Sequence, residues 1–513
     1  MTSRLTTTIL PDDKRYPALS RGFNQRWLAE PEYVRMVRTP QDVREALAKA
    51  VQEKPKDPSR TRITVRSGGH CYENFVCGTD VRVILDMSPM CGISYDEKMD
   101  AYCVEAGASN WHTYSHLYPL SGRALPGGSC YSVGLGGHIP GGGYGLLSRQ
   151  FGLTVDYLYA VEVAVVRPDK SVELVVASRD STDDDVKNLW WAHTGGGGGN
   201  FGVVTRFWFR DPPEPPKYVL LTGLAWDWDT VTRSDFTTLL TAFGTYFQQH
   251  QDPMTAAGKL FGILVLNHVC NGQIGLLAQV DVDDPQGKQA MDDFLAAVDG
   301  DISATATTMS STMGERPTLA QMAIPRVMPW LTATQALDSS GENRCGKYKS
   351  AYIRKPFSNA QIDAMWAYLG NEKFVDYTNK ESVIQIDSYG GAVNKPPRDT
   401  AARQRDSILK MQYQTYWTRN DPKESEYLDW IRQTYKATFS ETGGVPTVGT
   451  GITDGCYINY PDVDLGDPAW NGSEQRWSTL YYKDAYPTLQ KIKKHWDPHD
   501  IFRSAQSIEF PTS

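Results

Sequence analysis

The chain has 513 residues, of which 40% are hydrophobic, 22% charged and 11% aromatic, and this is the composition of an ordinary globular protein. At about 100–200 residues per domain, the length corresponds to two or three domains. The net charge of −8 and the absence of any run of lysine and arginine argue against nucleic acid or an anionic membrane as the main partner.

Neither a membrane span nor a secretion signal is visible. No apolar run approaches the roughly 18 residues of a membrane helix, and residues 1–16 contain no apolar signal-peptide core. We therefore expect a cytoplasmic or secreted protein. The cysteines, at positions 71, 77, 91, 103, 130, 270, 345 and 456, are too sparse for a disulfide scaffold and form no Cys-x-x-Cys pair, so no metal site is expected.

The first part of the chain alternates between strands and glycine-rich turns. Residues 40–53 have an amphipathic pattern after a proline start, which predicts a helix. Strands are expected at 61–66, 81–87 and 102–108, as a strand pair or a long strand with a turn at 155–170, and directly after the five glycines of 190–202.

Residues 211–216 mark the clearest boundary, because four prolines in six residues disfavour both a helix and a central strand. The following region has fewer glycines and contains an alternating strand at 382–391. The last stretch, 480–502, is predicted to be helical as far as its Trp-Asp-Pro sequence. We therefore divide the chain into residues 1–212, a middle domain of residues 213–450, and residues 451–513, which return to the first domain.

Residues 126–145 are the most glycine-dense part of the chain, with nine glycines in twenty residues. Each glycine inside a helix or strand costs about 0.5–1 kcal/mol relative to alanine, so this density indicates backbone wrapped around a ligand. Main-chain N–H groups in such a loop can bind a diphosphate. The segment is not a P-loop, and Ile139 stands where a Rossmann fingerprint needs glycine, which also argues against a nicotinamide-dependent dehydrogenase.

Two residues in glycine-rich settings are candidates for chemistry. His70 ends a strand and two glycines; a histidine in such a turn is by itself more often satisfied by backbone groups. Cys130 would ordinarily be a buried core thiol, but its polar, glycine-rich loop offers little apolar core to join.

The order of several motifs resembles that of the berberine bridge enzyme-like branch of the vanillyl-alcohol-oxidase-type flavoproteins. The motifs are Arg-Ser-Gly-Gly-His at 66–70, Pro-Gly-Gly-Ser-Cys opening 126–138, Gly-Gly-Gly-x-Gly at 141–145, the glycine-rich segment 190–202, Tyr-Ile-Asn-Tyr-Pro-Asp at 457–462 and Trp-Asp-Pro-x-Asp-x-Phe at 496–502. The resemblance spans nearly the whole chain and is greatest to bacterial members that tailor antibiotics and glycosides and to carbohydrate oxidases. It implies an α+β fold, with a two-part FAD-binding domain of the vanillyl-alcohol-oxidase type and an α/β substrate domain with an antiparallel sheet.

The resemblance also implies a covalent FAD. In that family the histidine corresponding to His70 bonds to the flavin 8α-methyl group, and the cysteine corresponding to Cys130 bonds to C6. Two such links are expected to raise the flavin potential and to allow an open site that suits a bulky substrate. The remaining residues expected at the cofactor are Arg66, Ser67, Gly68, Gly69, Gly127, Gly128, Ser129, Val133, Gly134, Gly136, Gly137, His138, Gly142, Gly143, Asn200, Phe201, Gly202, Val203 and Asn459.

Oxidation of an alcohol requires a base for the hydroxyl proton as well as the flavin. Alternation in the strand at 382–391 places Gln385, Asp387 and Tyr389 on one face. That stripe is equally consistent with a solvent-facing face, but carbohydrate-oxidising relatives present a Gln and an Asp to the substrate from this strand. In the family a tyrosine of the 457–462 motif is the base. We favour Tyr460, with Asp387 as its hydrogen-bond partner and Tyr457 as the alternative base.

Three further expectations concern the reaction. Tyr144 either lines the substrate entrance or fills space. Small residues in 133–137 leave a path for O2, which favours an oxidase over a dehydrogenase with another acceptor. The partners expected are a sugar, lactol or secondary alcohol and O2, in a monomer or homodimer; the competing hypothesis is a non-catalytic carbohydrate-binding protein that keeps the flavin fold.

Overall fold

The protein is described from a computed structural model, which covers residues 7–449 and 451–512. The first six residues, which belong to the segment searched for a secretion signal, and residue 450, which stands at the predicted domain boundary, lie outside this description. Within the covered ranges no helix combines the length and the apolar character that a membrane crossing requires.

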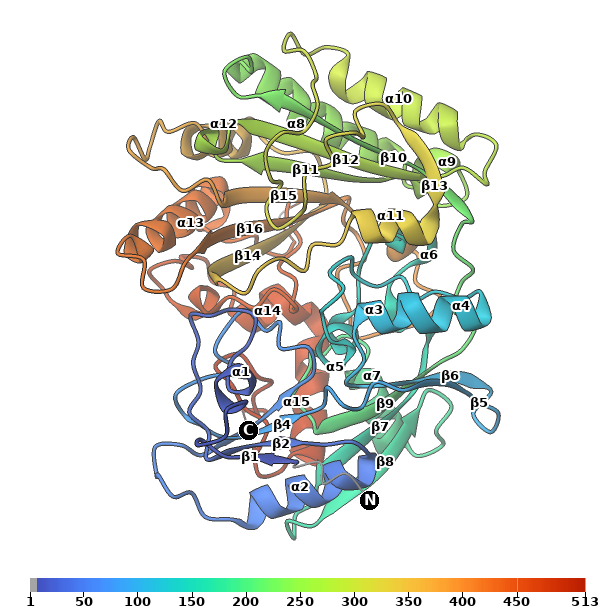
Figure 1. Ribbon diagram of the computed structural model, residues 1–513, viewed down its shortest axis with the longest axis vertical. Coiled ribbons are helices and arrows are strands. Elements are labelled where there is room, and N and C mark those ends of the chain that lie inside the picture. The colour runs from blue at the N-terminus through green and yellow to red at the C-terminus, as the bar shows by residue number, and fades with distance from the viewer. Residues whose placement is uncertain (1–6, 450, 513) are drawn as a thin grey trace.

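Two smaller sheets occupy the lower part of the molecule (Figure 1). The first is four-stranded, with the order β1 (Thr8–Ile9), β2 (Tyr33–Met36), β4 (Val81–Asp86) and β3 (Arg62–Arg66), and its last three strands are parallel. The second is five-stranded and antiparallel, with the order β5 (Ile93–Asp96), β6 (Ala101–Glu105), β9 (Val203–Phe209), β7 (Leu158–Val166) and β8 (Val172–Ser178).

A seven-stranded antiparallel sheet forms the upper part of the molecule. Its order is β13 (Arg326–Pro329), β10 (Tyr218–Asp227), β12 (Gln273–Asp281), β11 (Phe261–Asn267), β15 (Ser382–Ser388), β16 (Leu409–Trp417) and β14 (Cys345–Ile353). Its inner strands are buried on both faces, because one face is covered by helices and the other faces the rest of the protein.

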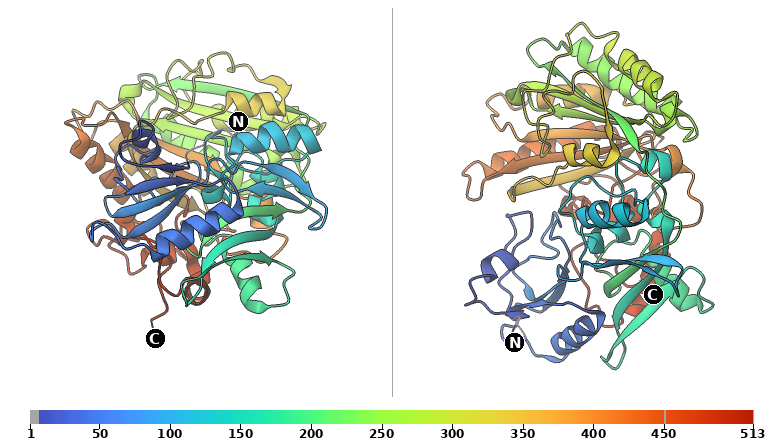
Figure 2. Two further views of the ribbon diagram at one scale, coloured as in Figure 1. Left: turned by 60° about the horizontal axis from the view of Figure 1, so that its bottom comes forward. Right: turned by 45° about the vertical axis from the view of Figure 1, so that its right-hand side comes forward.

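The longer helices cover the sheets. They are α2 (Pro40–Gln52), α7 (Asp184–Ala192), α8 (Arg233–Gln249), α10 (Gly287–Asp299), α12 (Asn359–Leu369), α13 (Glu424–Thr438) and α15 (Tyr486–Trp496). Helices α8, α10, α12 and α13 lie along the side of the seven-stranded sheet that points away from the other two sheets (Figures 1 and 2). Shorter helices are α1 (Tyr16–Leu19), α3 (Asn110–His112), α4 (Tyr118–Ser121), α5 (Leu135–His138), α6 (Ser148–Phe151), α9 (Ala256–Lys259), α11 (Trp330–Ala336) and α14 (Trp477–Tyr482).

The α+β class and the antiparallel sheet are confirmed. Helix α2 begins where the proline start predicted, and the Thr39 side chain caps it by accepting a hydrogen bond from the Asp42 N–H. Of the two alternatives for 155–170, the structure has the long strand with a turn: β7 covers Leu158–Val166, and its partner β8 begins only at Val172.

Two predicted elements differ from the structure. The helix expected from residue 480 is interrupted, because Lys483 has a φ of 49°, outside the helical region, and separates α14 from α15. The strand expected over 382–391 ends at Ser388, ahead of Gly390 with a φ of 86°. Tyr389 therefore does not share the face of Gln385 and Asp387; its hydroxyl donates to the Gln404 carbonyl at 3.0 Å.

Candidate active site

A long cavity lies between the seven-stranded sheet and the glycine-rich loops of the lower part. Its lining includes the segments around His70 and Cys130, strands β15 and β16, and the carboxyl-terminal segment around Tyr460. The two residues expected to hold the flavin therefore line the same cavity as the candidate catalytic residues, which are Tyr144, Gln385, Asp387, Tyr457 and Tyr460.

Glycines bring the two loops of this cavity into contact. A Cβ atom on Gly134 would lie 2.0 Å from the Gly68 nitrogen, and one on Gly68 would lie 2.3 Å from the Gly134 nitrogen, so any side chain at either position would force the loops apart. Ser67 also joins them, because its hydroxyl donates to Ala106 O at 2.7 Å and accepts from the Gly136 N–H at 3.3 Å. Part of the glycine density is thus required for the close packing of the loop at Gly68 against the loop at Gly134.

Other glycines leave room at the cavity. A Cβ on Gly137 or Gly199 would meet no atom within 4 Å, and both glycines line the cavity. The carboxylates among the described lining residues, Glu315 and Asp387, both belong to the substrate-side loops and strands. A glycine-rich cradle without carboxylates fits the diphosphate and ring of FAD.

The imidazole of His70 is fixed by a hydrogen bond and a ring contact. Its Nε2 atom lies 2.8 Å from the Ser132 hydroxyl, and its ring stacks on Phe23 with centroids 4.3 Å apart. Burial lowers the pKa of His70 to about 4, although Asp338 opposes this shift. The imidazole is therefore neutral near pH 7 and keeps the lone pair that a bond to carbon requires.

Cys130 lies on the same cavity, in the opposite loop. Its thiol donates to the Ser339 carbonyl at 3.2 Å and lies 2.9 Å from the Ser339 hydroxyl. Burial raises the pKa of Cys130 to about 11, with a further contribution from Glu315. The thiol is therefore protonated at rest.

Lys410 of β16 is the centre of the substrate-side cluster. Its ammonium donates to the Tyr460 hydroxyl at 3.2 Å and lies 3.2 Å from Asp387 Oδ2. It also lies over the rings of Tyr144 at 4.1 Å and Tyr457 at 5.2 Å. No direct hydrogen bond joins Tyr460 to Asp387 among the described contacts, so Lys410 stands between the two groups that we had expected to touch.

The polar face of β15 continues onto β16. Asp387 is directly opposite Lys410 in the strand register, and Gln385 is opposite Gln412. The Gln385 amide donates to Asp387 Oδ1 at 2.7 Å, and the Gln412 amide donates to the Tyr72 hydroxyl at 3.0 Å. The two strands thus present a row of amides, one carboxylate and one ammonium to the cavity.

The two tyrosines of the 457–462 motif have different environments. Burial raises the pKa of Tyr457 to about 12, while Lys410 and the Asn459 amide, which donates to its hydroxyl at 2.8 Å, oppose the shift. Burial, followed by Asp387, raises the pKa of Tyr460 well above its usual value. Asn459 also donates to His138 O at 2.9 Å and so fixes Tyr457 to the cofactor loop.

Some predicted cofactor residues do not line the cavity. They are Gly127, Gly142, Gly143 and Phe201. Phe201 is fully buried in the core, and a Cβ on Gly143 would lie 2.5 Å from the Thr154 side chain, so both are needed for packing. Arg66 and Asn200 line the cavity, but Arg66 pairs with Asp86.

Asn200 also has a structural role. Its amide donates to Gly196 O at 3.0 Å, and its side-chain oxygen accepts from the Ile508 N–H at 2.9 Å. Lys493 of α15 donates to Asn200 O at 2.9 Å. The glycine loop of 190–202 is therefore held by the carboxyl-terminal segment.

The predicted residue Tyr144 lines the cavity, and its hydroxyl donates to the Ser388 carbonyl.

Several lining residues were not predicted. They are Tyr72, Asn110, Glu315, Arg316, Ser339, Lys410, Gln412 and Gln414. The sequence Leu-Lys-Met-Gln-Tyr-Gln at 409–414 alternates as clearly as the strand at 382–388, so its polar face was available as a signal. Glu315 and Arg316 lie in a loop, where polar and apolar residues do not alternate regularly, so no sequence pattern could identify them as lining residues.

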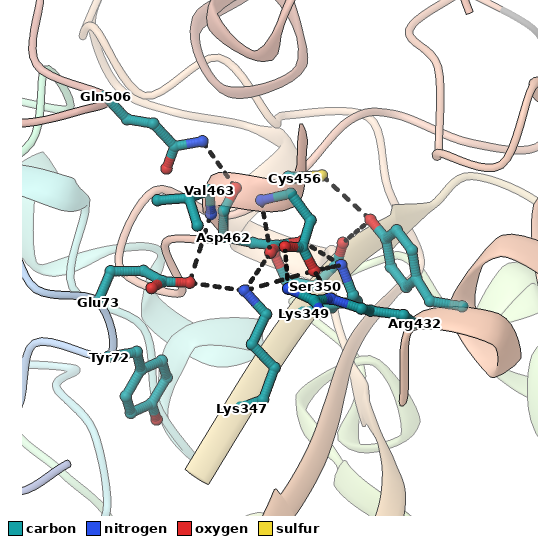
Figure 3. A network of polar contacts seen from close by, with 12 residues as sticks. Tyr72, Glu73, Lys347, Lys349, Ser350, Arg432, Cys456, Asp462, Val463 and Gln506 are labelled. Atoms are coloured by element: carbon teal, nitrogen blue, oxygen red, sulfur yellow. Dashed lines mark hydrogen bonds and ion pairs between the residues drawn. The ribbon is translucent and has the colours of Figure 1, made fainter. Parts of the chain in front are cut away.

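A buried ion network supports Tyr72 and Tyr460, two lining tyrosines whose ring centroids are 5.5 Å apart. Lys347 of β14 contacts Glu73 at 2.7 Å and Asp462 at 2.7 Å (Figure 3). Glu73 directly follows Tyr72 in the chain, and Asp462 lies two residues after Tyr460. Burial lowers the pKa of Lys347, but Asp462, Glu73 and Asp464 together raise it above the usual value.

Further members complete this network. Lys349 contacts Asp462 at 2.7 Å and Asp464 at 2.8 Å, and Arg432 of α13 pairs with Asp464 at 2.9 Å. Three acids thus balance three bases at a junction of the amino-terminal loop, the seven-stranded sheet and the carboxyl-terminal segment.

Comparison with known proteins agrees with this arrangement. Residues 31–169 match the FAD binding domain family, and residues 456–509 match the family described as berberine and berberine like. The chain is 41% identical to aclacinomycin-N/aclacinomycin-A oxidase of Streptomyces galilaeus over 97% of this chain and 89% of that protein. It is 37% identical to hexose oxidase of Chondrus crispus over 97% and 93%, respectively.

A solved structure shows the same likeness over the whole length. The glycopeptide hexose oxidase DBV29 complexed with teicoplanin has a TM-score of 0.87 and 38% identity, covering 98% of each chain. The fold is accordingly that of the vanillyl-alcohol-oxidase-type FAD-binding oxidases, as the motifs predicted. The chain belongs to the berberine bridge enzyme-like family of FAD-linked oxidoreductases.

Proposed function

We propose that this protein is an oxidase with a bicovalent FAD, linked 8α to His70 and through C6 to Cys130, that oxidises an alcohol, lactol or sugar hydroxyl carbon. The observation that carries the proposal is that both attachment residues and the Tyr460–Lys410–Asp387 cluster line one cavity. When bound, FAD would supply the two-electron acceptor for hydride from the substrate carbon, with O2 as the final electron acceptor and H2O2 as its product.

Tyr460 is proposed to take the proton of the substrate hydroxyl. Its oxygen accepts a hydrogen bond from Lys410, which stabilises the phenolate, and it is more exposed to the cavity than the buried Tyr457. Tyr457 remains the alternative base, because Lys410 and Asn459 lower its pKa against the effect of burial. The Asp387 carboxylate pairs with the Lys410 ammonium and so holds Lys410 in place beside Tyr460.

The amide row of Gln385, Gln412 and Gln414 supports a substrate with several hydroxyl groups. Amides both donate and accept hydrogen bonds, and so match the hydroxyls of a sugar. The names of the relatives, which include a hexose oxidase and a glycopeptide hexose oxidase, support a sugar or the sugar of a glycosylated or polyketide-type natural product.

The domain division is also a proposal. Residues 1–212 and 451–513 would form the FAD-binding part, and residues 213–450 the substrate-binding part. It is supported by the seven-stranded sheet, whose strands all fall within residues 218–417, and by the packing of α15 against α7.

A screen for H2O2 release tests the proposed activity. Free hexoses, lactols, secondary alcohols and glycosides would be mixed with the yellow protein in air, and each substrate that releases H2O2 would then be mixed anaerobically to observe bleaching of the flavin. Bleaching without H2O2 release in air would indicate a dehydrogenase with another acceptor. Binding of sugars without bleaching would indicate a non-catalytic protein.

A further inference from the structure

The loop between α10 and β13 places a carboxyl group, that of Glu315, on the cavity that Cys130 also lines. Its Oε1 atom is buried and has no hydrogen-bond partner among the described residues. Burial raises the pKa of Glu315 to about 8, and Tyr416, Arg344 and Arg316 oppose this only in part. A buried carboxyl oxygen without a partner is costly to keep, which indicates a role in the cavity.

One short segment connects Glu315 with the Cys130 thiol. Ser339 contacts the sulfur through both its carbonyl and its hydroxyl, as described above. Two residues further on, a Cβ on Gly341 would lie 3.1 Å from Glu315 Oε1, so the carboxyl packs directly on that glycine. After burial, Glu315 is also the largest influence that raises the pKa of Cys130.

The thiol requires a base before it can form a bond to carbon. A thiolate is the nucleophile, and Cys130, with a pKa near 11, is protonated at neutral pH. The Ser339 carbonyl and hydroxyl accept a hydrogen bond but cannot take the proton. With a pKa of about 8, Glu315 is mostly protonated at pH 7, but its ionised fraction, which grows as the pH rises, is a stronger base than an ordinary glutamate, whose pKa is about 4.5.

The other titratable groups around Cys130 have hydrogen-bond partners of their own or carry a positive charge. Asp338 Oδ1 already accepts hydrogen bonds from the Tyr131 N–H at 2.9 Å and from Ser340, through its N–H at 3.0 Å and its hydroxyl at 2.7 Å. His70 is bonded to Ser132 and is the other attachment residue. Arg316 is a cation that donates to Leu337 O at 3.0 Å.

We propose that Glu315 is the base that removes the thiol proton of Cys130 when the protein attaches its own flavin. The inference rests on the proposed bicovalent FAD. The S–H bond breaks and its proton passes to Glu315 within the cavity that both side chains line; the sulfur bonds to C6 and the C6 proton is lost. The ring keeps the two electrons as reduced flavin, and O2 removes them to give the oxidised, S-linked flavin and H2O2.

The test compares the two links within the same protein molecules. Wild type, Glu315→Gln and Glu315→Asp are sampled at intervals after induction, and peptide mass spectrometry gives the fraction of Cys130 peptide and of His70 peptide that carries flavin. Glu315→Gln should slow formation of the Cys130 link by about 10²-fold, the lower range of general-base effects, while the His70 link forms as in wild type. Glu315→Asp should restore part of the rate.

Asp338→Asn is the matched control, because it neutralises the other carboxylate near Cys130. It should retain the Cys130 link. An unchanged Cys130 link in Glu315→Gln, a loss of both links together, or a loss in Asp338→Asn alone would each overturn the assignment of Glu315. Absence of the Cys130 link from the wild type would instead overturn the bicovalent flavin on which the inference rests.

Discussion

The ammonium of Lys410 lies 3.2 Å from the phenolic oxygen of Tyr460 and 3.2 Å from the carboxylate of Asp387. A cation shared by a phenol and a carboxylate stabilises the phenolate while its own charge is balanced. Mutation can therefore test separately the proposed base, Tyr460, and the cation expected to lower its pKa, Lys410.

Tyr460→Phe should lower the rate of flavin reduction by about 10²–10⁴-fold, because it removes the group proposed to take the hydroxyl proton. The apparent affinity for substrate should change little, since the ring remains. Anaerobic stopped-flow measurement of flavin bleaching gives both quantities. Tyr457→Phe is the control and should cause the smaller loss; the reverse order would assign the base to Tyr457.

Lys410→Met should shift the acidic limb of the pH profile of flavin reduction to higher pH. The reaction needs the deprotonated phenol, and a cation at this distance lowers a pKa by about 1–3 units, so its loss raises the pH at which the base is available. Lys410→Arg retains the charge and should keep the wild-type limb approximately. Identical profiles for Lys410→Met and the wild type would show that Lys410 does not tune the base.

Gly137→Val tests the path for O2. Because a Cβ at Gly137 meets no atom within 4 Å, the larger side chain should project into the cavity without disturbing the fold. Reoxidation of the reduced flavin by O2 should slow, while anaerobic reduction by substrate continues. The contrasting variant Gly134→Ala drives a methyl group into the Gly68 backbone and should lose flavin binding.

Lys347→Met should destabilise the protein by about 3–5 kcal/mol, because it leaves the buried carboxylates Glu73 and Asp462 without one counter-ion. Thermal melting followed by flavin release and by circular dichroism measures the effect. Arg233→Met is the control: it removes an exposed ion pair with Asp363 and should leave the melting midpoint nearly unchanged. Equal midpoints for the two variants would show that the buried network contributes no stability.

The strands and their order of appearance were predictable because alternation and glycine turns are local properties. The helix α2 and strands β3, β4, β7 and β9 fall where the pattern of the sequence placed them. The interruption at Lys483 was not predictable, because a non-glycine residue with positive φ leaves no mark in the hydrophobic period.

The sequence predicted many of the residues that belong to the site, but not which of them contact one another. The motifs located His70, Cys130 and the tyrosines, yet the position of Lys410 between Tyr460 and Asp387 depends on the pairing of β15 with β16, which single-strand patterns do not give. Glu315 lies in a loop without a period and reaches the cavity only through tertiary packing. Gly143 and Phe201 show the opposite case, in which a motif residue serves packing alone.

The fraction of flavin that stays attached after acid denaturation tests the central claim most directly. Intact-mass spectrometry would be applied to the wild type, His70→Ala, Cys130→Ala and the double variant. The account predicts flavin attached in the wild type and in each single variant, with one link remaining, and none attached in the double variant. Release of all flavin from the wild type, or full attachment in the double variant, would contradict it.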